Sequence, residues 1–278
     1  MSTTTTRKTS AATGAGPALT AMSDPAAEAA VHAAAKTLQL PTIRDQAIPM
    51  AEAAAKQRLT HKAFLAEMLT AECDERDARR RLRRGVNEAK FPRTKRLADF
   101  DTARLPDLPA ATLAHLAGGS WIDAGQPLVL LGDSGTGKTH LLIALGTAAA
   151  EQGRRVRYVT TAALVNELVE AADEKQLSRV VARYARLDLL CLDEVGYVGL
   201  DPRGAELLFQ IITAREERAS IACASNAPFS EWGNTFPDPR LAAAVVDRLT
   251  FNAHIIQTGT TSYRLTSSTA TRKENNPT

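Results

Sequence analysis

The chain has 278 residues, a formal net charge of +3, and 23% charged and 44% hydrophobic residues. It is long enough for one large domain or two unequal ones, and no stretch reaches the roughly 18 consecutive apolar residues of a membrane span, which excludes an integral membrane protein. Three cysteines, Cys73, Cys191 and Cys223, are spaced too irregularly for a disulfide framework or a zinc site, so we expect a reduced, cytoplasmic protein.

The first 110 residues divide by composition into three parts. Residues 1–25 are mostly Thr, Ser, Ala, Gly and Pro, which bury too little apolar surface to become ordered, so they predict a disordered tail. Residues 26–90 are rich in Ala, Leu, Glu, Lys and Arg, which predicts a small all-α N-terminal domain for DNA binding or assembly. Residues 91–110 contain three prolines and predict a linker, because proline lacks the amide hydrogen that a helix needs.

A strongly basic run lies at the end of the helical region. Between Arg76 and Arg96, ten basic residues stand against two acidic ones, an excess of +8 in 21 residues. Arginines spaced three and four apart can share one helix face, so the run predicts salt-sensitive, sequence-independent contacts with the phosphates of duplex DNA. The alternative is a solvated helix face paired with neighbouring acidic residues. The DNA-binding candidates in this run are Arg79, Arg80, Arg83, Arg84, Lys90 and Lys95.

In residues 111–268, short apolar runs alternate with helix-length segments. This alternation predicts an α/β fold with a five-stranded parallel sheet between helices, followed by a disordered tail over residues 269–278. The predicted strands are Leu128–Leu131, Val156–Thr160, Leu187–Leu192, Ile221–Ser225 and Ala253–Gln257. Lys175 and Arg179, after the second of these strands, are a second candidate DNA contact, for which a plain exposed helix is an equally good interpretation.

A complete phosphate-binding signature follows the first predicted strand. Eight residues match G-x-x-x-x-G-K-[ST], and a helical run follows them. The glycines let backbone amides approach phosphate oxygens at a helix N-terminus, Lys138 is expected to reach the β- and γ-phosphates of ATP, and the Thr139 hydroxyl to ligate Mg²⁺. A chance glycine-rich turn is the alternative. The predicted ATP-binding residues are Gly132, Asp133, Ser134, Gly135, Thr136, Gly137, Lys138, Thr139 and His140.

Two carboxylates follow the apolar part of the third predicted strand. Ligands of open α/β sheets bind at the carboxyl ends of the strands, so we expect Asp193 to hold Mg²⁺ through a water and Glu194 to polarise the attacking water. The alternative for the pair is a helix N-cap. Asn226, at the tip of the next strand, is expected to hydrogen-bond the γ-phosphate or that water, or else to form a turn. The order of these segments also predicts that the Asp193 strand lies beside the P-loop strand, in the class of ATPases that carries an inserted strand between them.

These motifs, with Gly196-Tyr197, Ser225–Trp232 and Asp247-Arg248-Leu249, resemble the IstB family. Members of that family are ATPase helper proteins of insertion-sequence transposition, related to DnaC-type helicase loaders within the AAA+ class of P-loop NTPases. The resemblance implies ATP-dependent self-assembly on duplex DNA and stimulation of a partner transposase. A helicase loader for DNA replication is the alternative function, and a nucleotide-dependent switch without turnover is a third.

The resemblance also implies that a neighbouring copy completes the site. In AAA+ proteins the nucleotide lies between subunits of a homo-oligomer, and Arg248 matches the family's arginine finger, which stabilises charge on the transferring phosphoryl group. Arg240 is the second candidate, and a surface arginine paired with Asp247 is the alternative interpretation of Arg248. Phe100, where the linker approaches the P-loop, is expected either to pack on the adenine or to plug the core.

Overall fold

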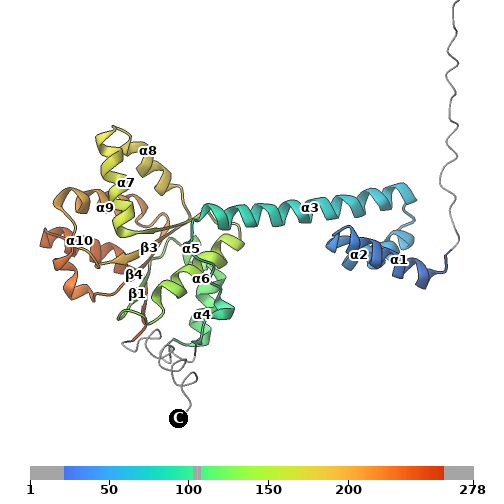
Figure 1. Ribbon diagram of the computed structural model, residues 1–278, viewed down its shortest axis with the longest axis horizontal. Helices are drawn as coiled ribbons and strands as arrows, with labels where there is room; N and C mark the ends of the chain where they lie inside the picture. Colours follow the sequence, from blue (N-terminus) through green and yellow to red (C-terminus); the bar gives the residue numbers. More distant parts are fainter. Residues whose placement is uncertain (1–21, 103–104, 106–107, 260–278) are drawn as a thin grey trace, which may run out of the picture. The chain divides into compact units, whose positions relative to one another are not determined.

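The structure is a computed structural model that describes residues 22–102, 105 and 108–259 (Figure 1). It divides into two compact units, with the division between Ala78 and Arg79. The predicted tail over residues 269–278 lies outside the described residues, and so do residues 1–21 of the other predicted tail. Helix α1 begins at Asp24. No helix in the described part of the chain is long and apolar enough to cross a membrane.

The first unit is helical. It contains α1 (Asp24–Thr37), α2 (Pro41–Lys56) and the first part of α3 (His61–Glu88). Proline is well placed as the first residue of α2, where an amide hydrogen has no partner within the helix. The buried carboxylate of Glu72 accepts hydrogen bonds from the backbone amides of Thr42 and Ile43, at 2.9 and 3.1 Å. A side chain of α3 thereby satisfies two amides in the first turn of α2.

The last turns of α3 belong to the second unit. Ala89 is fully buried, and its carbonyl accepts a hydrogen bond of 2.8 Å from the backbone amide of Tyr158. The ring of Phe91 lies 6.1 Å from that of Tyr158, centroid to centroid, and packs against the same core. Helix α3 therefore contributes residues to both units.

The second unit contains the predicted five-stranded parallel sheet. Its strands are β1 (Leu128–Leu131), β2 (Val156–Thr160), β3 (Leu189–Val195), β4 (Ser220–Ser225) and β5 (His254–Gln257), in the spatial order β2-β3-β4-β1-β5. β4 lies between β3 and β1, so the Asp193 strand is not the direct neighbour of the P-loop strand, but one inserted strand separates the two, as in the predicted class of ATPases. β4 is buried along its whole length and carries small side chains such as Ala222 and Ala224, which suit a central strand with helices on both faces.

Two layers of helices cover the sheet. One face carries α4 (Ala110–Gly118), α5 (Ser120–Asp123) and α6 (Lys138–Glu151), and the other carries α7 (Thr161–Asp173), α8 (Leu177–Ala185), α9 (Pro202–Arg215) and α10 (Pro239–Thr250) (Figure 1). Alternating strand residues serve the two cores: Leu128 and Leu130 of β1 face the first layer, and Val129 and Leu131 face the second. This three-layer arrangement confirms the predicted α/β class.

One residue of β3 interrupts the register of the sheet. Leu192 and Val195 pair with Cys223 and Ser225 of β4, so β3 contains one residue more than its partner between these two pairs. This is a β-bulge, and within it Glu194 has φ of +60°. This is a left-handed backbone conformation that residues other than glycine rarely adopt in a strand. The other described non-glycine residues with positive φ each lie two residues beyond the end of a helix: Gln39, Arg58, Lys90, Lys175, Glu217 and Asn252.

We expect Glu194→Gly to raise the free energy of unfolding by up to about 1 kcal/mol, because relief of about 1–2 kcal/mol of left-handed strain exceeds the added chain entropy of glycine, about 0.5–1 kcal/mol. The matched control is Glu206→Gly on the exposed face of α9, where the same substitution should cost about 0.5–1 kcal/mol. Urea unfolding of the two variants measures both values. An equal loss in both would mean that Glu194 is not strained.

Candidate nucleotide site

The P-loop occupies the turn between the end of β1 and the start of α6. Gly132 has φ of +150°, and a Cβ atom there would lie 2.4 Å from Thr258 Oγ1 and 2.8 Å from the carbonyl oxygen of Gly259. Gly137, the residue before α6, has φ of +100°. The loop can therefore adopt this path only with glycine at these positions, as the signature requires.

Residues after β5 support the loop from the side. The hydroxyl oxygens of Thr136 and Thr258 are 2.6 Å apart, and the backbone amide of Asp133 donates to the carbonyl of Gly259 at 3.1 Å. The amide of Thr258 in turn donates to the carbonyl of Leu131 at 2.7 Å. The sequence analysis missed Thr258, and a lone threonine after an apolar strand gave no signal for this role.

Lys138 lies over the P-loop. Its side chain is almost fully buried, with 5% of the residue exposed, and Nζ donates to the carbonyl of Asp133 at 2.7 Å. The ammonium group is thus held beside the backbone amides of the loop, where a phosphate would meet both.

The carboxylate of Asp193 joins the P-loop helix to the third strand. Its Oδ1 lies 3.3 Å from Thr139 Oγ1 and accepts a hydrogen bond of 2.9 Å from the backbone amide of Glu194. Its Oδ2 accepts a hydrogen bond of 2.7 Å from the hydroxyl of Tyr158 on β2. The structure therefore brings together Thr139 and Asp193, the two predicted Mg²⁺ ligands, although they lie 54 positions apart in the sequence.

Tyr158 is a site residue that the sequence analysis missed. Burial, and next its hydrogen bond to Asp193, raise the pKa of Tyr158 well above its ordinary value, so the phenol stays protonated and donates. In the sequence it is one aromatic residue in a short apolar strand, a pattern typical of core packing.

Glu194 and Asn226 lie at neighbouring strand ends. Glu194 is exposed in the β3 bulge, and Asn226 is the first residue after β4 and half-buried. The hydroxyl of Ser225 accepts a hydrogen bond from the amide of Ala227 at 3.1 Å and donates to its carbonyl at 2.7 Å, which fixes the turn that carries Asn226. Both predicted water-binding side chains are thus at the same edge of the sheet as the P-loop.

Phe100 and His140 pack against each other beside the P-loop. Their ring centroids are 5.3 Å apart in an edge-to-face arrangement, and a Cβ atom on Gly137 would lie 3.5 Å from Phe100. Partial burial, and next the charge of Lys95, lower the pKa of His140, so its ring is neutral at pH 7. Phe100 also contacts the core under α6, so both interpretations of this residue, adenine packing and core packing, are compatible with its position.

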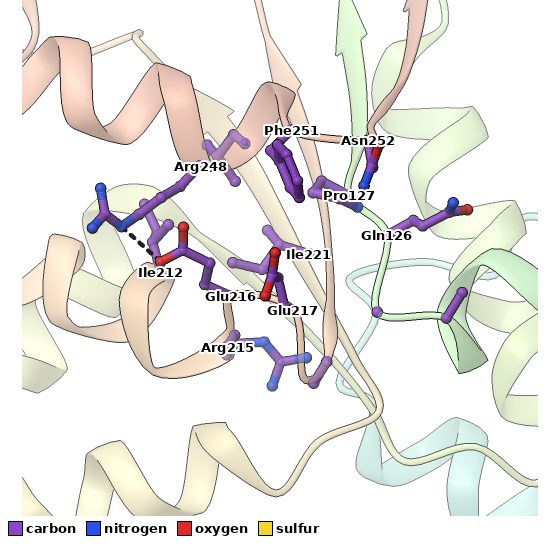
Figure 2. Close-up of a pocket in the computed structure, with 14 residues that line it drawn as sticks. Gln126, Pro127, Ile212, Arg215, Glu216, Glu217, Ile221, Arg248, Phe251 and Asn252 are labelled. Atoms are coloured by element: carbon purple, nitrogen blue, oxygen red, sulfur yellow. Dashed lines mark ion pairs between the residues drawn. The ribbon is translucent and has the colours of Figure 1, made fainter.

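Arg248 on α10 points toward Glu216 and forms an ion pair with it (Figure 2). Its Nε is 3.0 Å from Glu216 Oε2, and its guanidinium carbon lies 4.7 Å from the centroid of the Phe209 ring. The ion pair therefore goes to Glu216 and not, as one interpretation of the sequence had it, to Asp247.

A cavity of about 260 Å³ lies beside Arg248. Pro127, just before β1, and Asn252, just before β5, line it, so it lies at the edge of the sheet where these strands begin. The P-loop is at the opposite edge, and the whole length of β1 separates the two. Arg240, the second candidate, is exposed in the first turn of α10.

The predicted DNA-binding residues are on the surface of the second unit. Arg79, Arg80, Arg83 and Arg84 are exposed on α3, Lys90 is exposed just after it, and Lys95 is half-buried. Lys175 is exposed in the connection between α7 and α8, and Arg179 is exposed in the first turn of α8.

The donors at the site suit a magnesium ion held together with nucleotide phosphates. In the residues described here, no group of three or more His, Cys, Asp or Glu side chains could hold a metal ion without further ligands. The hydroxyl of Thr139 and the carboxylate of Asp193 are hard oxygen donors, and Mg²⁺ is commonly bound by one or two such groups, phosphate oxygens and waters.

Comparison with known proteins places the chain in a family. A family model described as IstB-like ATP binding protein matches residues 33–271. The chain is 40% identical over 228 residues to an insertion sequence ATP-binding protein of Sinorhizobium fredii, which covers 82% of this chain and 76% of that protein. It is 34% identical over 235 residues to the ATP-binding protein of insertion sequence IS5376 of Geobacillus stearothermophilus, covering 84% and 93%.

A solved structure supports the fold. The crystal structure of a DNA replication initiation factor matches with a TM-score of 0.52 and 20% identity, over 66% of this chain and 55% of that one, which is a likeness of fold alone. The predicted AAA+ P-loop core is confirmed, and the chain belongs to the IstB-like ATP-binding protein family.

Proposed function

We propose that the protein is an ATP-hydrolysing AAA+ regulator that assembles on duplex DNA and stimulates the transposase of an insertion sequence. The observation that carries the ATPase part is the contact of the P-loop helix with the third strand, where Thr139 Oγ1 lies 3.3 Å from Oδ1 of Asp193, the residue before Glu194. The transposition part is supported by the relatives, which are named as ATP-binding proteins of insertion sequences.

Each residue of the site has a separate task in phosphoryl transfer to water. Lys138 and the P-loop amides neutralise charge on the β- and γ-phosphates. Glu194 takes the proton of the attacking water, and Asn226 orients that water. Thr139, and Asp193 through a water, would hold Mg²⁺, which would offset the charge that develops on the phosphates.

Arg248 serves the nucleotide of a neighbouring copy. The length of β1 separates it from its own P-loop, whereas an arginine finger must touch the transferring phosphoryl group. Glu216 and the ring of Phe209 hold its guanidinium in one place before any neighbour arrives. A homo-oligomer with nucleotide between its subunits follows from this division of the site.

The basic face of α3 is the first candidate for the DNA contact. Its arginines are exposed, recur at three- and four-residue intervals, and lie within the unit that contains the nucleotide site. A face of this kind binds phosphates and does not read bases, so its affinity falls steeply with salt. Lys175 and Arg179 are the second candidate.

Lys138→Ala and Glu194→Gln should separate nucleotide binding from hydrolysis. We expect Lys138→Ala to weaken ATP binding by about 10- to 100-fold, because a charged hydrogen-bond donor to phosphate is lost. Glu194→Gln should keep ATP binding and lower hydrolysis by about 10²- to 10⁴-fold, which would trap the assembled state on DNA. Calorimetry, phosphate release and electron microscopy measure the three effects, with Glu206→Gln on α9 as the control. Wild-type hydrolysis by Glu194→Gln would remove its role as the base.

The trans action of Arg248 can be tested by mixing two inactive variants. Arg248→Ala should lower hydrolysis by about 10³- to 10⁵-fold and retain ATP binding. Mixed with Lys138→Ala, which keeps Arg248 but lacks the lysine, it should recover activity at junctions where an intact P-loop meets an intact arginine. The same mixture made with Arg240→Ala is the comparison. Recovery only with the Arg240 variant would assign the finger to Arg240, and recovery with neither would argue against a shared site.

The DNA contact can be mapped by charge reversal at equal change in net charge. We expect Arg83→Glu with Arg84→Glu to weaken binding to two unrelated duplexes alike and to reduce the slope of log affinity against log salt by about 0.9 per lost phosphate contact. Lys175→Glu with Arg179→Glu tests the second face, and Lys36→Glu with Lys56→Glu, both exposed in the first unit, is the control. Unchanged DNA affinity would exclude the mutated face as a DNA contact. A preference for single-stranded DNA would favour helicase loading.

A further inference from the structure

We propose that Tyr158 is the positioning residue that keeps one oxygen of Asp193 turned toward the Mg²⁺ site; this inference rests on the proposed ATPase function. Oδ2 of Asp193 accepts the phenol hydrogen at 2.7 Å. The other oxygen, Oδ1, is left on the side of Thr139 Oγ1, 3.3 Å away. Without the phenol, the plane of the carboxylate could turn about the Cβ–Cγ bond, and an oxygen would no longer be held at this angle toward Thr139.

The hydrogen bonds of Asp193 fix its backbone as well as its carboxylate. The hydroxyl of Thr161, at the start of α7, donates to the Asp193 carbonyl at 3.0 Å. The amide of Glu194 donates to Oδ1 at 2.9 Å within the β-bulge. Tyr158 is the side chain that holds Oδ2, so its removal leaves this oxygen of a residue only 4% exposed without its donor.

Tyr158 is itself held on three sides. Tyr158 pairs with Cys191 in the β2–β3 ladder, two positions before the pair of Thr160 and Asp193. Its backbone amide donates to Ala89 at 2.8 Å, and its ring lies 6.1 Å from that of Phe91. Alternate residues of a strand point to the same face, so the ladder directs the phenol along the sheet toward Asp193. A hydroxyl on so rigid a support can fix a carboxylate rotamer, as residues behind metal ligands commonly do.

The chain contains a matched control for the alternative that this hydrogen bond is only structural. Tyr184 on α8 is also buried, and its hydroxyl donates to Oε2 of Glu167 on α7 at 2.6 Å. Tyr158→Phe and Tyr184→Phe each remove one phenol–carboxylate hydrogen bond and keep the ring; the bond of Tyr158 is buried and that of Tyr184 is part-buried. Each should lose some stability, but only the first should alter metal binding.

The experiment measures metal affinity without turnover. Mn²⁺, as a paramagnetic substitute for Mg²⁺, is titrated into full-length protein with a non-hydrolysable ATP analogue and followed by electron paramagnetic resonance. We expect Tyr158→Phe to raise the half-saturating Mn²⁺ concentration by about 10-fold or more, as loss of a partner behind a metal ligand does, with metal-free analogue binding unchanged. Tyr184→Phe should match the wild type.

Three outcomes of this titration are distinct. An unchanged half-saturating concentration in Tyr158→Phe, or an equal rise in Tyr184→Phe, would overturn the positioning role. Metal-free binding lost together with metal binding would also overturn it, since the whole site would then have collapsed. A wild-type protein that binds neither analogue nor metal would instead refute the proposed ATPase function.

Discussion

The carboxylate of Asp193 is the point on which the nucleotide site depends. Thr139 from the P-loop helix, Tyr158 from the edge strand and the amide of Glu194 all contact its two oxygens. Two other segments, α6 and β2, are therefore set in place relative to one buried charge on β3. A buried carboxylate is costly unless it is hydrogen-bonded, so the contacts that make the charge tolerable are the same ones that orient it.

The residues proposed to bind nucleotide and metal could be predicted from the sequence better than the residues that support them. Gly132, Lys138 and Asp193 could be found because phosphate and metal chemistry demands particular residue types at fixed spacing. Tyr158 and Thr258 could not, because each acts through a neighbour that only the folded chain supplies. A hydroxyl that supports a carboxylate or a loop can come from any nearby element, so no fixed sequence spacing predicts it.

The strand order and the bulge show a second limit. Alternating apolar runs revealed all five strands, but a run of apolar residues does not say which strand is its neighbour, and it did not identify β4 as the strand between β3 and β1. Nor did the sequence show that Glu194 adopts a left-handed backbone inside a strand. Strain of this kind persists only when surrounding structure fixes it, and here the paired β4 strand and the Asp193 hydrogen bond do so.

One residue, Tyr158, joins the end of α3 to Asp193, the proposed metal ligand. The carbonyl of Ala89, just after the basic helix, receives the amide of Tyr158, and the hydroxyl of Tyr158 reaches Asp193. Hydrogen bonds weaken steeply when they lengthen or bend, so a displacement at the end of α3 that Tyr158 follows would change the contact of its hydroxyl with Asp193. The proposed DNA-binding helix and the proposed metal-binding carboxylate are thus connected by two hydrogen bonds and one rigid side chain. This route is short enough for the proposed DNA contact on α3 to alter the geometry of the proposed hydrolysis.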